Sequence, residues 1–158
     1  HLRDWTPPDE LWMEETLLDV LGSLSPDGQA PRLPRASARH DRFVHHVKEV
    51  LSSRAEHPWS VTAIAKVMRT SPFHACRVFR SRTGYTLHGY LTEQRLRRAL
   101  SRLGEGQDIC ELAVRLGFSS HSHFTAQFRS AFGVTPSEFR RHATPAAVRD
   151  LAGRLRTA

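Results

Sequence analysis

Hydrogen-bonding side chains gather in two short segments of this 158-residue chain. In the first segment Arg77 offers a planar fork of N–H donors, a shape that pairs with the O6 and N7 acceptors of guanine. The second segment, around Ser122, offers shorter or neutral hydroxyl and imidazole groups. No Ser/His/Asp, P-loop or dinucleotide-binding motif occurs in the sequence. These residues therefore predict recognition by hydrogen bonding, with no catalytic residue and no enzymatic activity.

Metal chemistry is not expected from the remaining candidate ligands. Cys76 and Cys110 are too few and too far apart for a CxxC zinc site or a disulfide framework, and are typical of plain helix residues in a reducing compartment. His45-His46 and His121-x-His123 lack the i, i+4 spacing that places two imidazoles on one helical face. The sequence therefore predicts no metal site and no cofactor.

The two segments are copies of one pattern, residues 61–82 and 109–132. Val61, Ile64, Ala65 and Met68 recur 48 positions later as Ile109, Leu112, Ala113 and Leu116. After one extra residue, Ser71, Ala75, Phe79, Arg80 and Gly84 recur 49 positions later as Ser120, Phe124, Phe128, Arg129 and Gly133. Each copy predicts helix, tight turn, helix, the helix-turn-helix motif that reads duplex DNA.

In such a motif the second helix enters the major groove, and its N-terminal residues reach base edges. Ser71 as N-cap and Pro72 at the first helical position begin this helix in the first copy, and Ser119 or Ser120 caps it in the second. Ala75, Val78, Phe79, Phe124 and Phe128 are expected to face inward. The predicted base contacts are Phe73, His74, Cys76 and Arg77, with His121, Ser122, Thr125 and Ala126. The predicted phosphate contacts are Ser71, Arg80, Arg82, Arg95, Arg97, Ser120, His123 and Arg129.

Two of these assignments have open alternatives. Arg77 is either a base contact or an arginine that is solvated or bound to phosphate, and Phe73 is either exposed at the groove or buried. The neutral groups of the second copy predict fewer strong base contacts there than in the first.

Helices predicted around the two copies position them. Residues 8–24 form an amphipathic helix with the stripe Leu11, Leu17, Leu18, Leu21 and Leu24, which packs on an upstream part or forms a subunit interface. Residues 25–40 form an exposed linker. Asp41 is the expected N-cap of the next helix, and Pro58 its stop.

Residues 86–103, between the two copies, are expected to form one helix about 27 Å long, which suits two readers placed on major-groove segments one turn apart. Thr135-Pro136-Ser137 begins a short helix whose Phe139 is expected to pack back, and the tail 143–158 is expected to fray. No strand alternation is evident, so the fold class is all-α.

Charge is distributed unevenly along the chain. Residues 1–30 hold one basic and seven acidic residues, whereas the remaining 128 hold 22 basic and 9 acidic residues. The basic part is expected to bind a polyanion, here double-stranded DNA. No run approaches the roughly 18 apolar residues that span a bilayer, and no signal pattern precedes the first helix. A cytoplasmic location without membrane association is therefore expected, and the first residue, His1, suggests a fragment of a longer protein.

The two helix-turn-helix copies share further residues at fixed spacing with a known family signature. The most specific run is Arg95-Leu96, Ile109, Leu112-Ala113, Leu116-Gly117-Phe118, Ser122-His123-Phe124, Phe128, Phe132-Gly133 and Thr135-Pro136, and the first copy adds Ser71-Pro72, Arg77, Phe79 and Thr83-Gly84. Over approximately residues 43–142 this pattern resembles the DNA-binding domain of the AraC/XylS family of bacterial transcription regulators. Ala75 and Ala126 depart from it, since the family usually has leucine and arginine at those positions.

The resemblance implies about seven helices arranged as two homeodomain-like helix-turn-helix subdomains within residues 41–142. It implies binding to two adjacent major-groove segments, control of RNA polymerase at a promoter, and groove positions at Phe73, Cys76, Arg77, His121, Ser122, Thr125 and Ala126. Residues 1–24 would then end an upstream sensing or dimerisation domain, with an unidentified effector and a homodimer formed through that part.

Two other functions remain open on the sequence. One is a DNA-repair-linked domain in which a zinc-held cysteine accepts a methyl group, although that chemistry needs a cysteine cluster. The other is a helical protein-interaction module, which would bind DNA weakly and without salt dependence.

Overall fold

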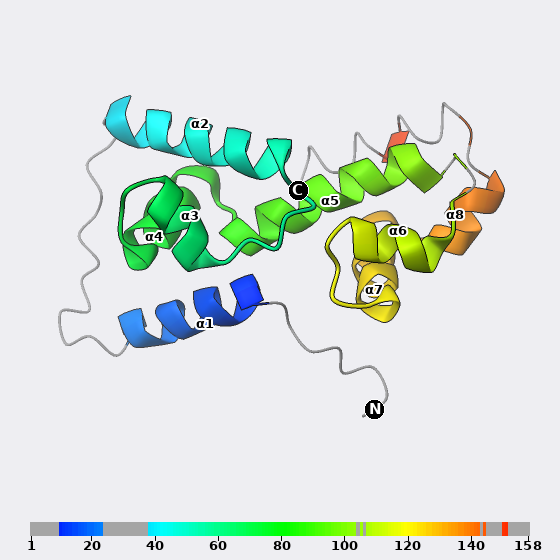
Figure 1. The fold of residues 1–158 in the computed structure, drawn as a ribbon, viewed down its shortest axis with the longest axis horizontal. Helices are drawn as coiled ribbons and strands as arrows, with labels where there is room; N and C mark the ends of the chain where they lie inside the picture. The colour runs from blue at the N-terminus through cyan, green and yellow to red at the C-terminus, as the bar shows by residue number, and fades with distance from the viewer. Residues whose placement is uncertain are drawn as a thin grey trace. The chain divides into compact units, whose positions relative to one another are not determined.

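The described part of the chain is all-helical, as predicted. The computed structural model describes residues 10–23, 38–103, 105, 107–142, 144 and 150–151, and no strand occurs among them. The helices of these residues are α1 Glu10–Ser23, α2 Ala38–Ser53, α3 Val61–Val67, α4 Pro72–Thr83, α5 Leu87–Leu103, α6 Ile109–Arg115, α7 His121–Phe132 and α8 Pro136–His142 (Figure 1). No helix in the described ranges is both long and apolar enough to cross a membrane.

The chain folds into two compact units. The first unit comprises residues 9–54 and 58–91, and the second comprises residues 55–57 together with the described residues from 92 onward. The boundary falls inside α5, so that helix contributes to both units. Each unit holds one helix-turn-helix copy, α3 with α4 in the first and α6 with α7 in the second.

In the first unit the α3–α4 pair packs against α2 and α1, which lie on opposite sides of it (Figure 1). Apolar residues at helical spacing close the core, with Val47 and Leu51 from α2, Ile64 from α3, and Val78 and Phe79 from α4 all buried. The unit therefore has its own small hydrophobic core, from which the second helix of the motif presents its outer side.

In the second unit a chain of aromatic rings fills the core. The ring centroid of Phe128 lies 5.7 Å from that of Phe124, 4.6 Å from that of Phe132 and 5.9 Å from that of Phe139. These are ordinary distances for offset and edge-to-face pairs. Phe139 therefore packs back as predicted, and a capping box, in which Glu138 N donates to Thr135 Oγ1 and Thr135 N to Glu138 Oε2, begins its helix.

The turns of the two motifs share one hydrogen-bonding pattern. Thr70 N donates to Ala65 O in the first unit and Phe118 N to Ala113 O in the second, each at 3.0 Å, which is the long bond of a Schellman motif. The residue in the left-handed conformation is Arg69 in the first unit, with φ 52°, and Gly117 in the second, with φ 83°. The same turn is thus built with a side chain in one unit and without one in the other.

The predicted starts of the reading helices are confirmed. Ser71 caps α4 with Pro72 at its start, and of the two serines considered for α7 it is Ser120 that caps. Asp41 as an N-cap is wrong, because α2 begins at Ala38 and the Asp41 carboxylate instead accepts from Arg82. The stop assigned to Pro58 is also late, since α2 ends at Ser53.

The N-terminal helix forms at nearly the predicted length, but only part of its apolar stripe packs. Leu11 is buried, whereas Leu17 and Leu21 are 62% and 63% exposed. Leu24 and linker residues 25–37 lie outside the described residues, and residues 38–40 are helical. Of the tail 143–158 only residues 144 and 150–151 are described, and Leu151 is buried in the aromatic core of the second unit.

Candidate nucleic-acid interface

The outer side of α4 carries the groove residues predicted for the first unit. Ala75, Val78 and Phe79 are fully buried, as predicted, which leaves Phe73, Cys76, Arg77 and Arg80 on the other side; these four residues are the α4 face. Phe73 is 44% exposed, so the alternative of burial is excluded. The Arg77 guanidinium carbon lies 5.5 Å from the Phe73 ring centroid, and within the described residues its Nε atom is buried without a hydrogen-bond partner. This donor is therefore not used by any hydrogen bond within the described residues.

Other polar groups of α4 are already engaged within the first unit. His74 packs its ring on α2, 6.0 Å from the ring of His40 and 6.3 Å from that of Phe43. Burial, followed by the nearby positive charges of His40 and Arg77, lowers the pKa of His74 and favours its neutral form. Burial also raises the pKa of the Cys76 thiol to about 12, so Cys76 stays protonated.

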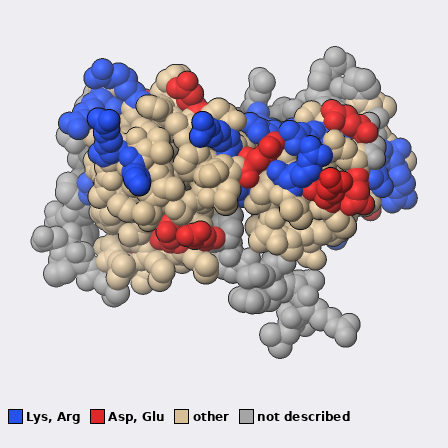
Figure 2. Space-filling view, viewed as in Figure 1, with Lys and Arg blue, Asp and Glu red and all other residues tan. Residues whose placement is uncertain are grey.

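Carboxylates pair with the basic residues at the C-terminal end of α4. Arg80 pairs with Asp19 of α1, and Arg82 pairs with Asp41 of α2. Figure 2 likewise shows acidic side chains among the basic ones on the face that it draws. The basic surface expected from the charge balance is therefore partly neutralised by the chain's own acids.

The outer side of α7 is open by comparison. His121, Ser122, Ala126 and Arg129 are exposed, and the Ser120 hydroxyl accepts from His123 N at 3.0 Å. Thr125 is half-buried, and its hydroxyl has no hydrogen-bond partner among the described residues. The second unit therefore presents neutral groups at the start of its reading helix and one arginine at the end.

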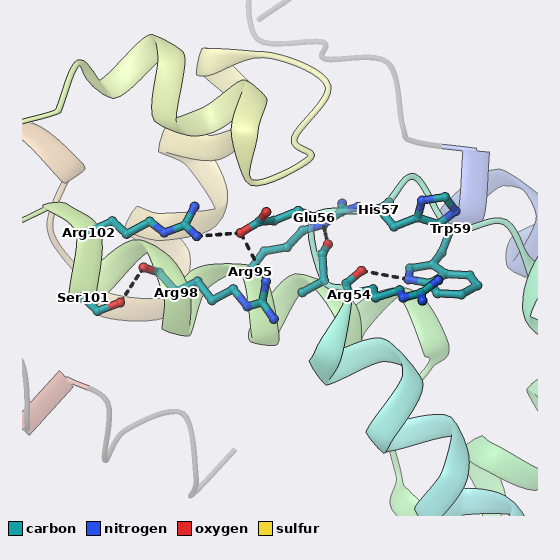
Figure 3. A network of polar contacts seen from close by, with 9 residues as sticks. Arg54, Glu56, His57, Trp59, Arg95, Arg98, Ser101 and Arg102 are labelled. Atoms are coloured by element: carbon teal, nitrogen blue, oxygen red, sulfur yellow. Dashed lines mark hydrogen bonds and ion pairs between the residues drawn. The ribbon is translucent and has the colours of Figure 1, made fainter.

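Two residues predicted to contact phosphate lie inside the second unit, and the structure contradicts their assignment. Arg95 is 3% exposed, and its Nε donates to Ala55 O at 2.9 Å and its Nη2 to His57 O at 3.2 Å (Figure 3). His123 is 8% exposed, with its Nδ1 2.9 Å from Ser119 Oγ. Both side chains satisfy polar groups within the fold, so neither is placed to reach a backbone phosphate.

Neighbouring basic residues of α5 are also tied into the fold. Glu56 accepts from Arg98 at 3.2 Å and from Arg102 at 2.8 Å, as Figure 3 shows. Arg97 pairs with Glu93 one turn earlier on the same helix. Spacing supplied a signal for the inward position of Arg95, because Leu91, Arg95, Ala99 and Leu103 follow one another at four-residue intervals.

Sequence reasoning missed the acids of α1. Glu14, Glu15 and Asp19 contact the first unit through backbone N–H groups and Arg80. Burial raises the pKa of Glu15, and the hydrogen bonds from His88 N and Leu87 N oppose that shift. The only sequence signal was the acidic balance of residues 1–30 against the basic remainder.

The helix-turn-helix domain family matches residues 64–142, half of the chain. A solved transcriptional regulator from Chromobacterium violaceum, described as having an AraC-type DNA-binding domain, is 29% identical; the match covers 69% of this chain and 99% of that one, with a TM-score of 0.62. The chain belongs to the AraC/XylS family. The transcriptional activator RhrA of Rhizobium meliloti is 36% identical over 110 residues, 68% of this chain and 35% of that protein.

One structurally similar protein was solved with nucleic acid. It is the DNA-binding domain of AdpA, a global transcriptional factor, in complex with a target DNA; it is 26% identical with a TM-score of 0.59, and the match covers 63% of this chain and 90% of that one. The AraC/XylS family consists of DNA-binding transcription regulators and not of enzymes. The chain spans about a third of the length of RhrA, so the activity of the whole protein remains a matter of proposal.

Proposed function

We propose that this chain is the DNA-reading part of an AraC/XylS transcription regulator and binds two adjacent major-groove segments, one with each unit. The observation that carries the proposal is the repeated reading helix. Both α4 and α7 begin at a serine cap and bury one side, and both end at a left-handed glycine, Gly84 or Gly133. Two copies of a groove-sized helix supply two readers.

The two readers divide the contacts unequally. Arg77 is the principal base contact, because its fork matches guanine and its half-buried side chain lies beside Phe73 on the α4 face. Phe73 and Cys76 support it, whereas His121, Ser122 and Ala126 serve the second unit. Phosphate contacts are proposed for Ser71, Arg80, Arg82, Arg97, Ser120 and Arg129. His74 and Thr125, both half-buried, remain secondary candidates for base contacts.

The rest of the regulator follows the family pattern. Residues 1–24 are proposed as the end of an upstream sensing or dimerisation domain, residues 25–40 as a linker, residues 41–142 as the DNA-binding domain and residues 143–158 as a tail. RNA polymerase, a homodimer partner and an effector of unidentified chemistry are the proposed partners besides DNA, in the cytoplasm.

The test is selection from random DNA duplexes at near-physiological salt, followed by sequencing of the bound fraction. Enrichment of two short boxes about one helical turn apart supports two readers. A single box limits reading to one unit, and the variants Arg77→Ala and Ser122→Ala identify which one. Binding that enriches no sequence contradicts the proposal, and binding insensitive to salt favours a protein-interaction module instead.

A further inference from the structure

Helix α1 lies against the α4 face. The α1 residues that line the space beside this face are Glu15, Leu18, Asp19 and Gly22, which recur at three- and four-residue intervals and so lie on one side of the helix. A Cβ atom added at Gly22 would lie 3.0 Å from Cε2 of Phe73, so α1 approaches the predicted groove residue closely. Residues of α1 and α4 that include Asp19, Gly22, Phe73, Cys76, Arg77 and Arg80 together line a cavity of about 380 Å³.

Three carboxylates hold α1 in this place. Glu14 accepts from Val61 N and, at 3.3 Å, from Thr62 N. Glu15 accepts from Leu87 N at 2.7 Å and from His88 N at 2.9 Å, and Asp19 pairs with Arg80. The acids therefore use backbone donors of the first unit and the arginine for which a phosphate contact is proposed.

The geometry excludes simultaneous binding of α1 and DNA to the α4 face. The major groove is about 12 Å wide and about 8.5 Å deep, and an α-helix with its side chains is about 10–12 Å across. The groove thus admits one helix. With α1 seated on Phe73 and Arg80, the outer side of α4 cannot enter it.

We propose that α1 is an autoinhibitory helix whose carboxylates occupy the DNA-reading side of the first unit, so that specific binding requires α1 to leave. The proposal rests on the proposed function. The Asp19 carboxylate pairs with Arg80, the residue proposed to contact a DNA phosphate. Helix α1 and DNA therefore compete for the same positive charge.

Few buried contacts hold α1 against the first unit. Among α1 residues Leu11 and Glu15 are the buried ones, and the helix leaves large apolar side chains, Trp12, Met13, Leu17, Val20 and Leu21, on its exposed side. The Asp19–Arg80 pair is itself more than half exposed at both side chains, and exposed ion pairs contribute little to stability. Detachment therefore uncovers a small part of the first unit's core.

The experiment measures affinity for a duplex carrying the selected boxes, using the full chain at one salt concentration. The variant Glu15→Gln/Asp19→Asn removes two carboxylates from the contact. The control Glu10→Gln/Glu49→Gln removes two exposed carboxylates and changes the net charge equally. If α1 covers the α4 face in about nine molecules of ten, the first variant binds about tenfold more tightly than the parent. The control stays within about twofold.

A second variant is designed to displace α1 from the α4 face without changing the net charge. Gly22→Leu places a branched side chain against Phe73 and is expected to displace α1 in the same direction, with tighter DNA binding. Circular dichroism melts verify that each variant folds. Hydrogen exchange at Leu87 N and His88 N, which Glu15 protects in the parent, verifies that α1 has moved.

A thiol probe reports the same opening without DNA. Cys76 is half-buried beside Glu15 and Asp19, whereas Cys110 is exposed and serves as an internal reference. The rate at which a thiol reagent modifies Cys76 should rise in both opening variants and stay unchanged in the control. Cys110 should react at one rate throughout.

The outcomes separate this proposal from the proposed function. Equal DNA affinity in the parent and in folded opening variants with a displaced α1 overturns autoinhibition and leaves the proposed function intact. An equal gain in the charge-matched control also overturns it, since net charge then explains the effect. Absence of sequence-selective binding in the parent and in every variant overturns the proposed function, and autoinhibition with it.

Discussion

The two helix-turn-helix units share a frame and differ on their reading sides. Their second helices begin at Ser71 and Ser120, and the turns of both copies have one hydrogen-bond pattern. The α4 face carries two arginines and is occupied by α1, whereas α7 exposes neutral groups and one arginine, Arg129, without such a cover among the described residues. The comparison teaches that the fold is held by caps, turns and core, which leaves the outer residues free to diverge in chemistry and in control.

The largest difference between the cores is at one aligned position, Phe124 in the second unit and Ala75 in the first. Phe124→Ala should lower the free energy of unfolding of the second unit by about 3–5 kcal/mol, because it removes a fully buried ring from the aromatic chain. Urea unfolding followed by circular dichroism measures the loss, and hydrogen exchange assigns it to α6 and α7. The exposed Phe73→Ala is the control, expected to change stability by less than about 1 kcal/mol. Equal losses in the two variants would refute the contrast between core and face.

The turns differ at a second aligned position. Gly117→Ala should destabilise by about 2–4 kcal/mol, since alanine pays the left-handed penalty and its Cβ would lie 2.9 Å from both Glu56 O and Arg95 Nη2. Thermal unfolding of the full chain measures the effect. The comparison variant is Gly133→Ala, where φ is similarly positive but no atom lies within 4 Å of the added Cβ, so a smaller loss is expected. A larger loss at Gly133 would contradict the steric part of the argument.

The reading sides differ in the kind of DNA contact they make. Arg77→Ala should weaken binding to the selected site by about 1–3 kcal/mol and relax base preference at one position. Arg129→Ala should weaken all sequences uniformly, as expected of a phosphate contact. Binding assays on a panel of single-base variants of the site check both. A uniform loss for Arg77, or a changed preference for Arg129, would reverse the two assignments.

The smallest effect concerns the arginine in the left-handed position. Arg69→Gly should stabilise the first unit by about 0.5–1 kcal/mol. Glycine relieves the backbone strain at φ 52°, and the larger conformational entropy that glycine loses on folding offsets part of this gain. The urea midpoint, compared with that of the parent at an unchanged slope, measures the gain. A loss of stability would mean that the Arg69 side chain makes a contact worth more than the strain.

The repeat explains why most of the frame was predictable from the sequence. The start of α4 at Ser71 and Pro72 and its buried positions could be predicted, because the residues that determine them all lie within that helix or at its start. The hydrogen-bond partners of Arg95 and of the α1 acids could not, because they lie about 40 positions away for Arg95 and 47 to 73 positions away for α1. Asp41 is not a cap because α2 begins three residues earlier, at Ala38, and its carboxylate instead accepts from Arg82 on another helix. Local chemistry set the elements, whereas distant partners decided which polar side chains reach solvent.

The short segment Ala55–His57 gives the second unit an unusual dependence on chain order. It precedes the whole first motif, yet Arg95 hydrogen-bonds to its carbonyls and Glu56 pairs with Arg98 and Arg102. During synthesis these three residues leave the ribosome before the groups that bind them exist, so the second unit completes only after the first has been made. A gene fragment that starts at residue 92 would encode Arg95 without its acceptors. A second unit transferred without residues 55–57 would therefore lack these hydrogen bonds and ion pairs.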